Sequence, residues 1–462
     1  MTPVRVLLAS AELAPVASVG GLAHAAAGLV RELRRHGVEV EAVLPDYGGV
    51  ALEGERVLEL EVPAWAAPGR ARRGTHPDVG RLTLVSVPGM RRPHPYTDER
   101  GVGWPDNDAR FLAFSAGVAA LARTTPPDIL HLNDWHAAAA LAWVDEALAT
   151  VLSIHNLAYQ GQTGVEWLVR LGPRADAFAH DGSCNPLAGA IRLADAIAVV
   201  SPTYREEVLR PEGGAGLDGI LRERERALVG IRNGIDVEVW NPATDPHLPA
   251  PFDADDLAGK ELARIALLER MGLPDLHLPL GVGVTRLVHQ KGFDLLLPLL
   301  EEPERLGLQL ALLGAGDAWL VRAFREASAA QPRFVAFVEG YDEALSHLLF
   351  GGGDLLLMPS RFEPCGLAQM QAMRYGTLPV VTDVGGLHDT VVDLDEDPER
   401  GTGWRARAAD TPSIAAALER AVRGWRSPAI RVPAQQRGMR ADWSWSEPAA
   451  AYHDLYRRLV GR

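Results

Sequence analysis

Short runs of apolar, β-branched residues alternate along the chain with longer stretches in which apolar positions recur at helical spacing. This alternation is typical of βαβ units, in which a helix returns the chain to the next parallel strand. We expect a first strand at Val4–Ser10, a helix at Leu22–His36 and a second strand at Val38–Leu44. Further strands of this half are expected at Asp128–Leu132, Thr150–His155, Ala196–Ser201 and Leu228–Arg232.

The pattern is interrupted at Trp240–Leu257, which contains Pro242, Pro246, Pro249 and Pro251 and shows no clear period. Such composition is typical of a domain linker. A second alternating series follows, with strands expected at Leu280–Thr285, Leu308–Leu313, Phe334–Val338, Asp354–Met358 and Pro379–Val381. The sequence therefore predicts an α/β protein with two doubly wound, Rossmann-like domains, at residues 1–240 and 241–435.

The last residues, 436–462, are predicted to form an amphipathic helix with aromatic anchors. These anchors are Trp443, Trp445, Tyr452 and Tyr456. The pattern leaves open whether the helix packs on the second domain or returns to the first.

Composition narrows the classes of partner. The 462 residues carry 60 acidic side chains against 46 Lys and Arg, a formal net charge of -14. This charge disfavours nucleic acid and anionic membranes and suits a neutral polymer such as a polysaccharide. The chain has two cysteines, no signal-peptide pattern and no apolar run of about 18 residues. We therefore expect a cytoplasmic protein that binds neither nucleic acid nor membrane.

Several polar motifs follow expected strands of the first half, where open α/β sheets bind ligands. Gly20-Gly21 opens the first helix and predicts either a phosphate contact or a tight turn. His131–His136 contains two His and an Asp but lacks a third convincing metal ligand, which leaves a helix cap or a substrate contact through His136. Asp106 is a candidate helix cap, and Ser153–Gly161 forms either a turn or part of a site.

The second half offers two cations at one strand end. Arg286 follows the strand Leu280–Thr285, and Lys291 comes five residues later. They are either surface charges or the groups that stabilise a departing diphosphate. Pro359–Leu367 adds a carboxylate, Glu363, before the start of a helix, and Gly385-Gly386 repeats the Gly-Gly-Leu pattern of the first half.

Together these residues resemble the bacterial glycogen synthases and plant starch synthases. The resemblance covers nearly the whole chain and rests on motifs in family order: Gly20–Leu22, Trp104–Asn107, Asn133–His136, His155–Gly161, Asn233–Asp236, Arg286-Leu287, Gln290–Gly292, Leu312–Asp317 and Pro359–Leu367.

The resemblance implies a GT-B fold with its active site in a cleft between the domains. It implies transfer of glucose from ADP-glucose to the non-reducing 4-hydroxyl of an α-1,4-glucan such as glycogen, with retention of configuration and with neither metal nor cofactor. The catalytic set that it implies is Arg286, Lys291, Glu363 and His136. Donor-binding residues are expected at Ser18, Gly20, Gly21, Asp106, Asn233, Tyr341, Cys365, Gly366, Leu367, Gln369, Gly385 and Gly386, with Tyr341 stacking on adenine. Acceptor residues are expected at Glu12, His155, Asn156, Tyr159 and Gln160.

The chain departs from the family pattern at three positions. Ser18 and His24 stand in the first loop where the family has a Lys and an Asp, and Ala188 stands where it often has a Lys. These differences keep two alternatives open: a catalytically weak glucan-binding homologue, and a retaining transferase that uses another sugar nucleotide.

Overall fold

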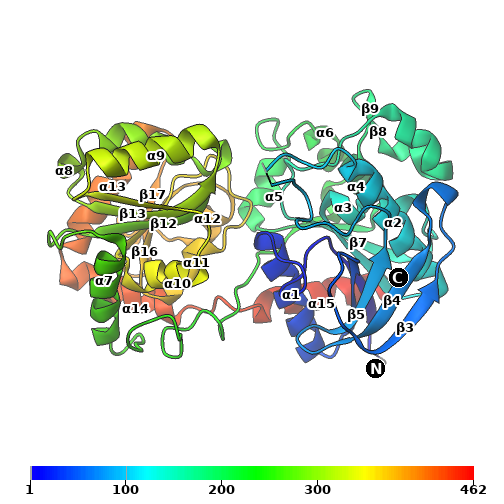
Figure 1. Cartoon of the computed structure of the whole chain (residues 1–462), viewed down its shortest axis with the longest axis horizontal. Coiled ribbons are helices and arrows are strands. Elements are labelled where there is room, and N and C mark those ends of the chain that lie inside the picture. Colours follow the sequence, from blue (N-terminus) through cyan, green and yellow to red (C-terminus); the bar gives the residue numbers. More distant parts are fainter. Residues whose placement is uncertain (1–2, 100, 462) are drawn as a thin grey trace. The chain divides into compact units, whose positions relative to one another are not determined.

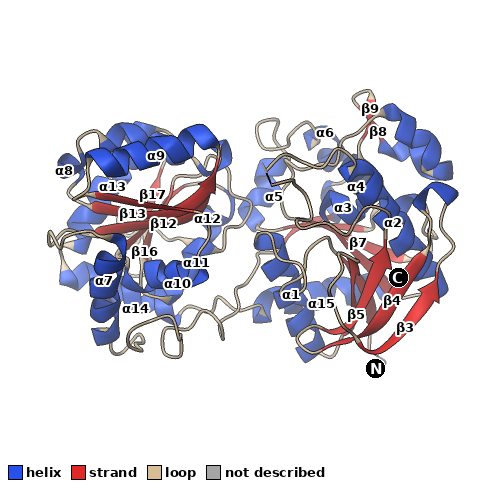
Figure 2. Ribbon diagram, in the orientation of Figure 1, coloured by secondary structure: helices blue, strands red, loops and turns tan. Residues whose placement is uncertain are grey.

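The computed structural model describes residues 3–99 and 101–461 and divides into two compact units. Unit 1 comprises residues 1–234 and 445–462, and unit 2 comprises residues 235–444. In each unit, helices lie on both faces of a central sheet (Figures 1 and 2). Two α/β units with parallel sheets confirm the predicted fold class.

Unit 1 is built on a sheet of nine strands within the described residues. In spatial order these are β11 (Leu228–Gly230), β10 (Ala196–Val199), β7 (Ala149–Ile154), β6 (Ile129–Asn133), β1 (Arg5–Ala9), β2 (Glu39–Pro45), β5 (Gly80–Ser86), β4 (Arg70–His76) and β3 (Glu53–Glu59). The pairs from β11 to β5 are parallel, and β5, β4 and β3 pair antiparallel. All strands expected in this half are confirmed, with ends shifted by at most two residues.

The antiparallel edge was not predicted, because charges replace the apolar alternation there. β3 is almost wholly exposed, and its carboxylates pair with arginines of β4. Arg70 bonds Glu59, and Arg72 bonds Glu55. Cross-strand ion pairs of this kind favour the register of an exposed edge without any hydrophobic signal in the sequence.

The helices of unit 1 begin with α1 (Gly21–Arg35), which confirms the helix expected there. The others are α2 (Asn107–Thr124), α3 (Asp134–Ala138), α4 (Pro186–Leu193), α5 (Pro202–Val208), α6 (Asp218–Glu223) and α15 (Ser446–Val460). Short 3-10 turns lie at Ala64–Ala66, Ala139–Ala142, Val165–Arg170, Gly172–Phe178 and Glu225–Ala227, and a small hairpin pairs Ala179–His180 with Ser183–Cys184.

The C-terminal helix α15 packs beside α1 and completes the core of unit 1 (Figure 1). A buried polar network joins it to the sheet: His131 shares hydrogen bonds with Tyr456 at 2.6 Å and with Ser153 at 2.7 Å. Ser153 also lies 2.9 Å from the hydroxyl of Tyr452. Burial lowers the pKa of His131 to about 3, so its ring is neutral at ordinary pH. The helix is therefore held by specific hydrogen bonds as well as by apolar packing.

Unit 2 has a sheet of six parallel strands within the described residues. Their order is β14 (Val335–Glu339), β13 (Gln309–Gly316), β12 (Leu280–Leu287), β15 (Leu355–Met358), β16 (Leu378–Thr382) and β17 (Trp404–Ala406). The five strands expected in this half are confirmed; β17, of three residues, was too short to predict.

The α-helices of unit 2 are α7 (Ala258–Met271), α8 (Pro303–Leu306), α9 (Ala318–Ala330), α10 (Glu343–Gly352), α11 (Ala368–Arg374), α12 (Gly385–Thr390), α13 (Thr411–Trp425) and α14 (Pro428–Arg440), with 3-10 segments η6 (His289–Lys291) and η7 (Phe293–Leu300). Helices α9 and α13 contact η7, whereas α10 contacts α7 and α11. Across the described part of the chain, every helix is too short or too polar to traverse a bilayer.

The proline-rich segment is not a free linker, which corrects the expectation from composition. It folds onto unit 2, where Trp240 stacks on His347 with ring centroids 4.0 Å apart. The carboxylate of Asp245 accepts hydrogen bonds from His347 at 2.7 Å and from Tyr375 at 2.5 Å. Irregular backbone is therefore ordered here by a buried network that the local sequence does not reveal.

Candidate active site

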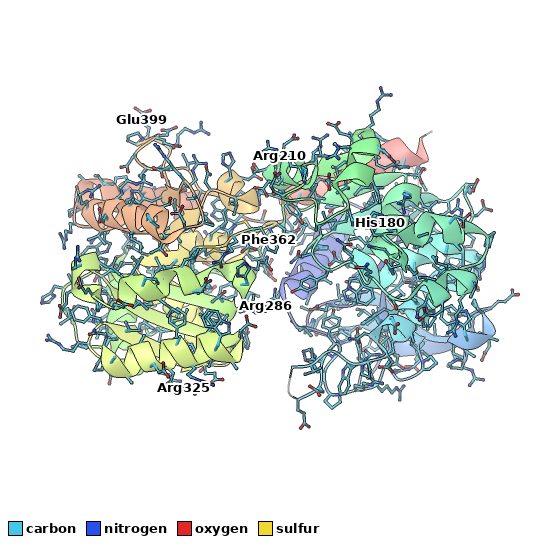
Figure 3. The ribbon with its side chains drawn as sticks, turned by 90° about the horizontal axis from the view of Figure 1, so that it is seen from above. His180, Arg210, Arg286, Arg325, Phe362 and Glu399 are labelled. Atoms are coloured by element: carbon cyan, nitrogen blue, oxygen red, sulfur yellow. The ribbon has the colours of Figure 1, made fainter. Side chains whose placement is uncertain are left out.

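The carboxyl ends of the parallel strands of unit 2 gather several of the expected residues at one edge of the sheet. Arg286 is the next-to-last residue of β12, and its side chain is exposed. No hydrogen bond or ion pair engages its guanidinium within residues 3–99 and 101–461. Figure 3 shows Arg286 and Phe362 at the same end of unit 2. An unpaired cation at this edge is suited to binding an anion.

Lys291, five residues after Arg286, forms an ion pair with Glu363. The ammonium Nζ of Lys291 donates to Oε2 of Glu363 at 2.6 Å, and the hydroxyl of Ser360 donates to the same oxygen at 3.0 Å. Glu363 is only 4% exposed. The other carboxylate oxygen, Oε1, accepts no hydrogen bond from the described residues. The carboxylate is thus fixed through one oxygen, whereas its other oxygen is not engaged by the described residues.

The loop that carries Glu363 is anchored along its length. Both guanidinium NH groups of Arg361 bond the Asp294 carboxylate at 2.7 Å, and Gln290 donates to the carbonyl of Phe362 at 3.3 Å. Gly292 adopts a positive φ of 67° and lies so close that a Cβ would come within 1.9 Å of the carbonyl oxygen of Pro359. Glycine at this position lets the Lys291 turn contact the loop.

The backbone at Glu363 and Cys365 packs tightly against the next strand-to-helix turn, which contains Gly386. The amide of Gly386 donates to the carbonyl of Glu363 at 3.0 Å, and a Cβ on Gly386 would lie 2.2 Å from the carbonyl oxygen of Cys365. Gln369 donates to the carbonyls of Cys365 and Gly366, and its own Oε1 is buried without a partner. Leu367 precedes α11 and Gly385 begins α12, so these two expected residues lie in the same cluster.

Tyr341 lies at the same sheet edge but farther from this cluster. It follows β14, two strands away from β12, and is 77% exposed. An exposed aromatic ring is available for stacking, although no contact joins it to Arg286 or Glu363 among the described residues.

The remaining expected residues belong to unit 1. There the carboxylate of Glu12 accepts hydrogen bonds from the loop that precedes α1. Oε2 of Glu12 accepts the amides of Val19 and Gly20 at 2.8 and 2.9 Å, and Oε1 accepts the hydroxyl of Tyr96 at 2.7 Å. The amide of Gly20 is therefore engaged within its own loop, whereas a donor contact at Gly20 and Gly21 stays a prediction. Ser18 is exposed, and Gly21 is the first residue of α1.

His136 is packed among aromatic rings. Its ring centroid lies 4.3 Å from that of Trp135, 4.6 Å from Phe111 and 5.2 Å from Tyr96. Burial lowers the pKa of His136 to about 3, and its Nδ1 is buried without a partner. A neutral imidazole of this kind can exchange hydrogen bonds but does not carry charge at neutral pH.

His155 lies beside Asn133 and Asp134. Its Nε2 is 2.9 Å from Oδ1 of Asn133, its backbone amide donates to Asp134 at 2.7 Å, and its Nδ1 has no partner. Burial lowers the pKa of His155 to about 4 and raises that of Asp134 to about 7. Asn156, next in sequence, accepts the amide of Ala158 at 3.0 Å.

Asp106 and Asn233 are engaged separately. Asp106 makes no side-chain cap for α2 but forms two bonds with Arg92, at 2.7 and 2.6 Å. The hydrogen bond from Arg92 lowers the pKa of Asp106. Asn233 is buried near the end of the first segment of unit 1.

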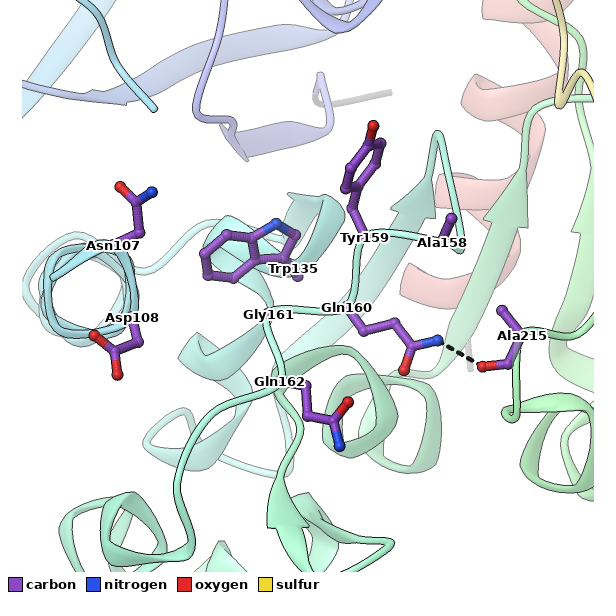
Figure 4. Close-up of a pocket in the computed structure, with 9 residues that line it drawn as sticks. All are labelled: Asn107, Asp108, Trp135, Ala158, Tyr159, Gln160, Gly161, Gln162 and Ala215. Atoms are coloured by element: carbon purple, nitrogen blue, oxygen red, sulfur yellow. Dashed lines mark hydrogen bonds between the residues drawn. The ribbon is translucent and has the colours of Figure 1, made fainter. Parts of the chain in front are cut away.

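A pocket of about 590 Å³ lies in unit 1 (Figure 4). It is lined by Asn107, Asp108, Trp135, Ala158, Tyr159, Gln160, Gly161, Gln162 and Ala215. Two aromatic rings and three amide side chains suit the apolar faces and the hydroxyls of a sugar. Tyr159 and Gln160 were expected in an acceptor site, whereas Glu12, His155 and Asn156 do not line this pocket.

The chain is similar to proteins of known family. A model of the starch synthase catalytic domain matches residues 5–223, and a model of group 1 glycosyl transferases matches residues 279–433. Glycogen synthases of Methylocella silvestris and Halorhodospira halophila are each 42% identical to the chain. The first alignment covers 100% of this chain and 99% of that protein, and the second covers 99% of each.

The chain belongs to the glycogen and starch synthase family of glycosyltransferases.

A solved member of this family has the same fold. The catalytic domain of starch synthase IV from Arabidopsis thaliana, bound to ADP and acarbose, matches with a TM-score of 0.88 and 34% identity over 100% of both chains. A sucrose-phosphate synthase from Thermosynechococcus elongatus matches with a TM-score of 0.62 and 19% identity over 99% of both chains, which extends the likeness at the level of fold. The GT-B assignment made from the sequence is confirmed.

Sequence reasoning missed several residues of these sites. Trp135, Asn107, Asp108 and Gln162 line the pocket, although the first two lie in motifs that carried the family resemblance. Ser360 contacts Glu363 and was also missed. Each lies within three residues of a predicted site residue, and that proximity was the available signal.

Proposed function

We propose that the protein transfers glucose from ADP-glucose to the non-reducing 4-hydroxyl of an α-1,4-glucan with retention of configuration. The observation that supports this most directly is the edge of unit 2 where β12 ends: Arg286 is unpaired among the described residues there, and Lys291, five residues later, is paired with Glu363. Family membership and a relative solved with ADP and acarbose favour the same donor and acceptor.

On the donor side, Arg286 and Lys291 bind the diphosphate and stabilise it as it leaves. One such contact at 4 Å contributes about 4 kcal/mol at an effective dielectric near 20, roughly a thousandfold in rate if it is made only in the transition state. Glu363 offers Oε1 to the sugar hydroxyls, and Tyr341 stacks on the base. Cys365, Gly366, Leu367, Gln369, Gly385 and Gly386 shape the backbone around the donor.

On the acceptor side, the pocket of unit 1 binds glucose units of the glucan. Trp135 and Tyr159 supply aromatic faces for the sugar rings, and Gln160, Gln162 and Asn107 supply donors and acceptors for hydroxyls. Asp108 is the one charged side chain in this lining, and its negative charge fits an uncharged polymer better than a phosphorylated one.

The chemical step in this proposal needs mainly positioning and stabilisation of the leaving group. The leaving phosphate takes the proton of the attacking 4-hydroxyl on the same face of the sugar, which accounts for retention. His136 stays neutral because of its burial and orients the sugar by hydrogen bonding. Attack by Glu363 as a nucleophile is the less favoured route.

The test is transfer from labelled ADP-glucose to glycogen by the purified protein, with ADP release measured in parallel. We expect turnover with ADP-glucose, label that α-1,4-specific exoglucanases remove, and loss of activity in Glu363→Ala. Preference for UDP-glucose in direct competition would overturn the donor assignment. Glycogen binding without turnover would favour the weak glucan-binding homologue, the alternative that the exposed Ser18 and His24 motivate.

A further inference from the structure

We propose that Ser360 is a positioning residue that holds the Glu363 carboxylate in place when Lys291 leaves it for the donor diphosphate. The inference rests on the proposed function, because it assumes that Lys291 binds the diphosphate. It assigns a role to a side chain that touches neither substrate.

The geometry of the site places both donors on one oxygen. Lys291 and Ser360 bond Oε2 of Glu363 at 2.6 and 3.0 Å, and Oε1 accepts no hydrogen bond from the described residues. Once a diphosphate is bound, Lys291 can therefore pair either with the Glu363 carboxylate or with the diphosphate. A diphosphate carries more negative charge than a carboxylate, and the flexible lysine stem can turn toward it.

Without a second donor, departure of Lys291 would leave Glu363 poorly fixed. The carboxylate is 4% exposed, so an unpartnered orientation would cost free energy and would compete with binding of the sugar. The hydroxyl of Ser360 supplies that second donor. The hydrogen bond from Ser360 to Oε2 keeps the carboxylate in one orientation, so that Oε1 stays available to the sugar.

Ser360 is itself rigidly held, unlike Lys291. It is 1% exposed, and its carbonyl accepts the hydroxyl of Thr382, the last residue of β16, at 2.5 Å. The following residue, Arg361, donates its amide to Gln290 at 2.9 Å. A hydroxyl whose backbone is held between two strand ends can keep a carboxylate fixed both before and after the donor binds.

The first test is Ser360→Ala in the full-length protein, with Ser360→Thr as the conservative variant. We expect kcat with ADP-glucose and glycogen to fall by about ten- to a hundredfold, because the Glu363 carboxylate is no longer held in its position. The KM for ADP-glucose and the affinity for ADP should change less than twofold, and Ser360→Thr should recover much of kcat. A kcat within twofold of wild type in Ser360→Ala overturns the proposal.

The matched control is Ser346→Ala. Ser346 is a buried serine of the same unit whose hydroxyl bonds the carbonyl of Glu343 at 2.7 Å, away from Glu363. Its removal should leave kcat unchanged. An equal loss of kcat in both variants would mean that Ser360 acts only through folding, and would also overturn the proposal.

A crystal structure of the wild-type protein with ADP tests, without relying on turnover, whether Lys291 moves from Glu363 to the diphosphate. We expect Nζ of Lys291 on the diphosphate, with the Ser360–Glu363 hydrogen bond retained. Lys291 still on Glu363, or a broken Ser360–Glu363 bond, overturns the inference. Absence of glucosyl transfer by the wild-type protein would instead count against the proposed function, so the two failures are distinguishable.

Discussion

Gly161 lies directly against the ring of Trp135: a Cβ on Gly161 would come within 2.1 Å of Cε3 of the indole. Gly161 also has a φ of 68°, which side-chain-bearing residues rarely adopt. The indole can therefore hold its place in the wall of the unit 1 pocket only while residue 161 is glycine.

Gly161→Ala is expected to displace Trp135 and weaken acceptor binding. The KM for glycogen should rise about tenfold, which corresponds to about 1.4 kcal/mol, while the KM for ADP-glucose stays unchanged. The control is Gly37→Ala, which has a similar φ of 79° but no atom within 4 Å of the added Cβ. Equal effects of the two variants on glycogen KM would show that the pocket does not bind the acceptor.

Arg286→Ala is expected to lower kcat by about a hundred- to a thousandfold through lost stabilisation of the leaving diphosphate. Because Arg286 has no partner in the described part of the chain, the free energy of unfolding should change by less than about 0.5 kcal/mol. Lys291→Ala should show a comparable loss of kcat. Kinetics and urea unfolding check both expectations.

The control for Arg286→Ala is Arg325→Ala, which removes an exposed cation of the same unit paired with Glu339. We expect full activity in that variant. A similar drop in kcat would indicate that general surface charge, not the position of Arg286, supports turnover.

The stability of unit 1 is expected to fall as pH rises from about 4 to about 7 through Asp134. Burial raises the pKa of its carboxyl to about 7, so the folded state holds a proton that the unfolded state has already released. Asp134→Asn stays neutral and should lose this pH dependence. Calorimetric unfolding at pH 5 and pH 8 checks this; an identical pH slope in the two proteins would refute it.

Asp245→Ala is expected to destabilise unit 2 by about 3 kcal/mol, because His347 and Tyr375 would lose their shared buried acceptor. Burial opposes ionisation of Asp245, but the bonds from His347 and Tyr375 lower its pKa below the usual value. Its stabilising effect is therefore present above pH of about 4 and is lost as pH falls through the lowered pKa. Denaturant unfolding of the wild type, Asp245→Ala and Asp245→Asn at neutral and acidic pH measures both the loss of stability and its pH dependence.

The predicted strands show how much of the fold the local hydrophobic pattern determines. Strands such as β6 and β12 are buried apolar runs of the kind that a parallel sheet requires, so the sequence alone determined their place and the fold class. It also determined that Arg286, Lys291 and Glu363 follow strand ends, because that depends only on order along the chain.

Only the tertiary structure decided which side chains meet. The shared oxygen of Glu363 joins residues 291 and 360, and the contact between Trp240 and His347 spans more than a hundred positions. The charged strand β3 is stabilised by partners on β4 and not by apolar burial, and Glu12 occupies amides that the motif alone suggested were free. Hydrophobic periodicity is a local property that sets the elements, whereas hydrogen-bond partners are set by three-dimensional packing of segments distant in sequence.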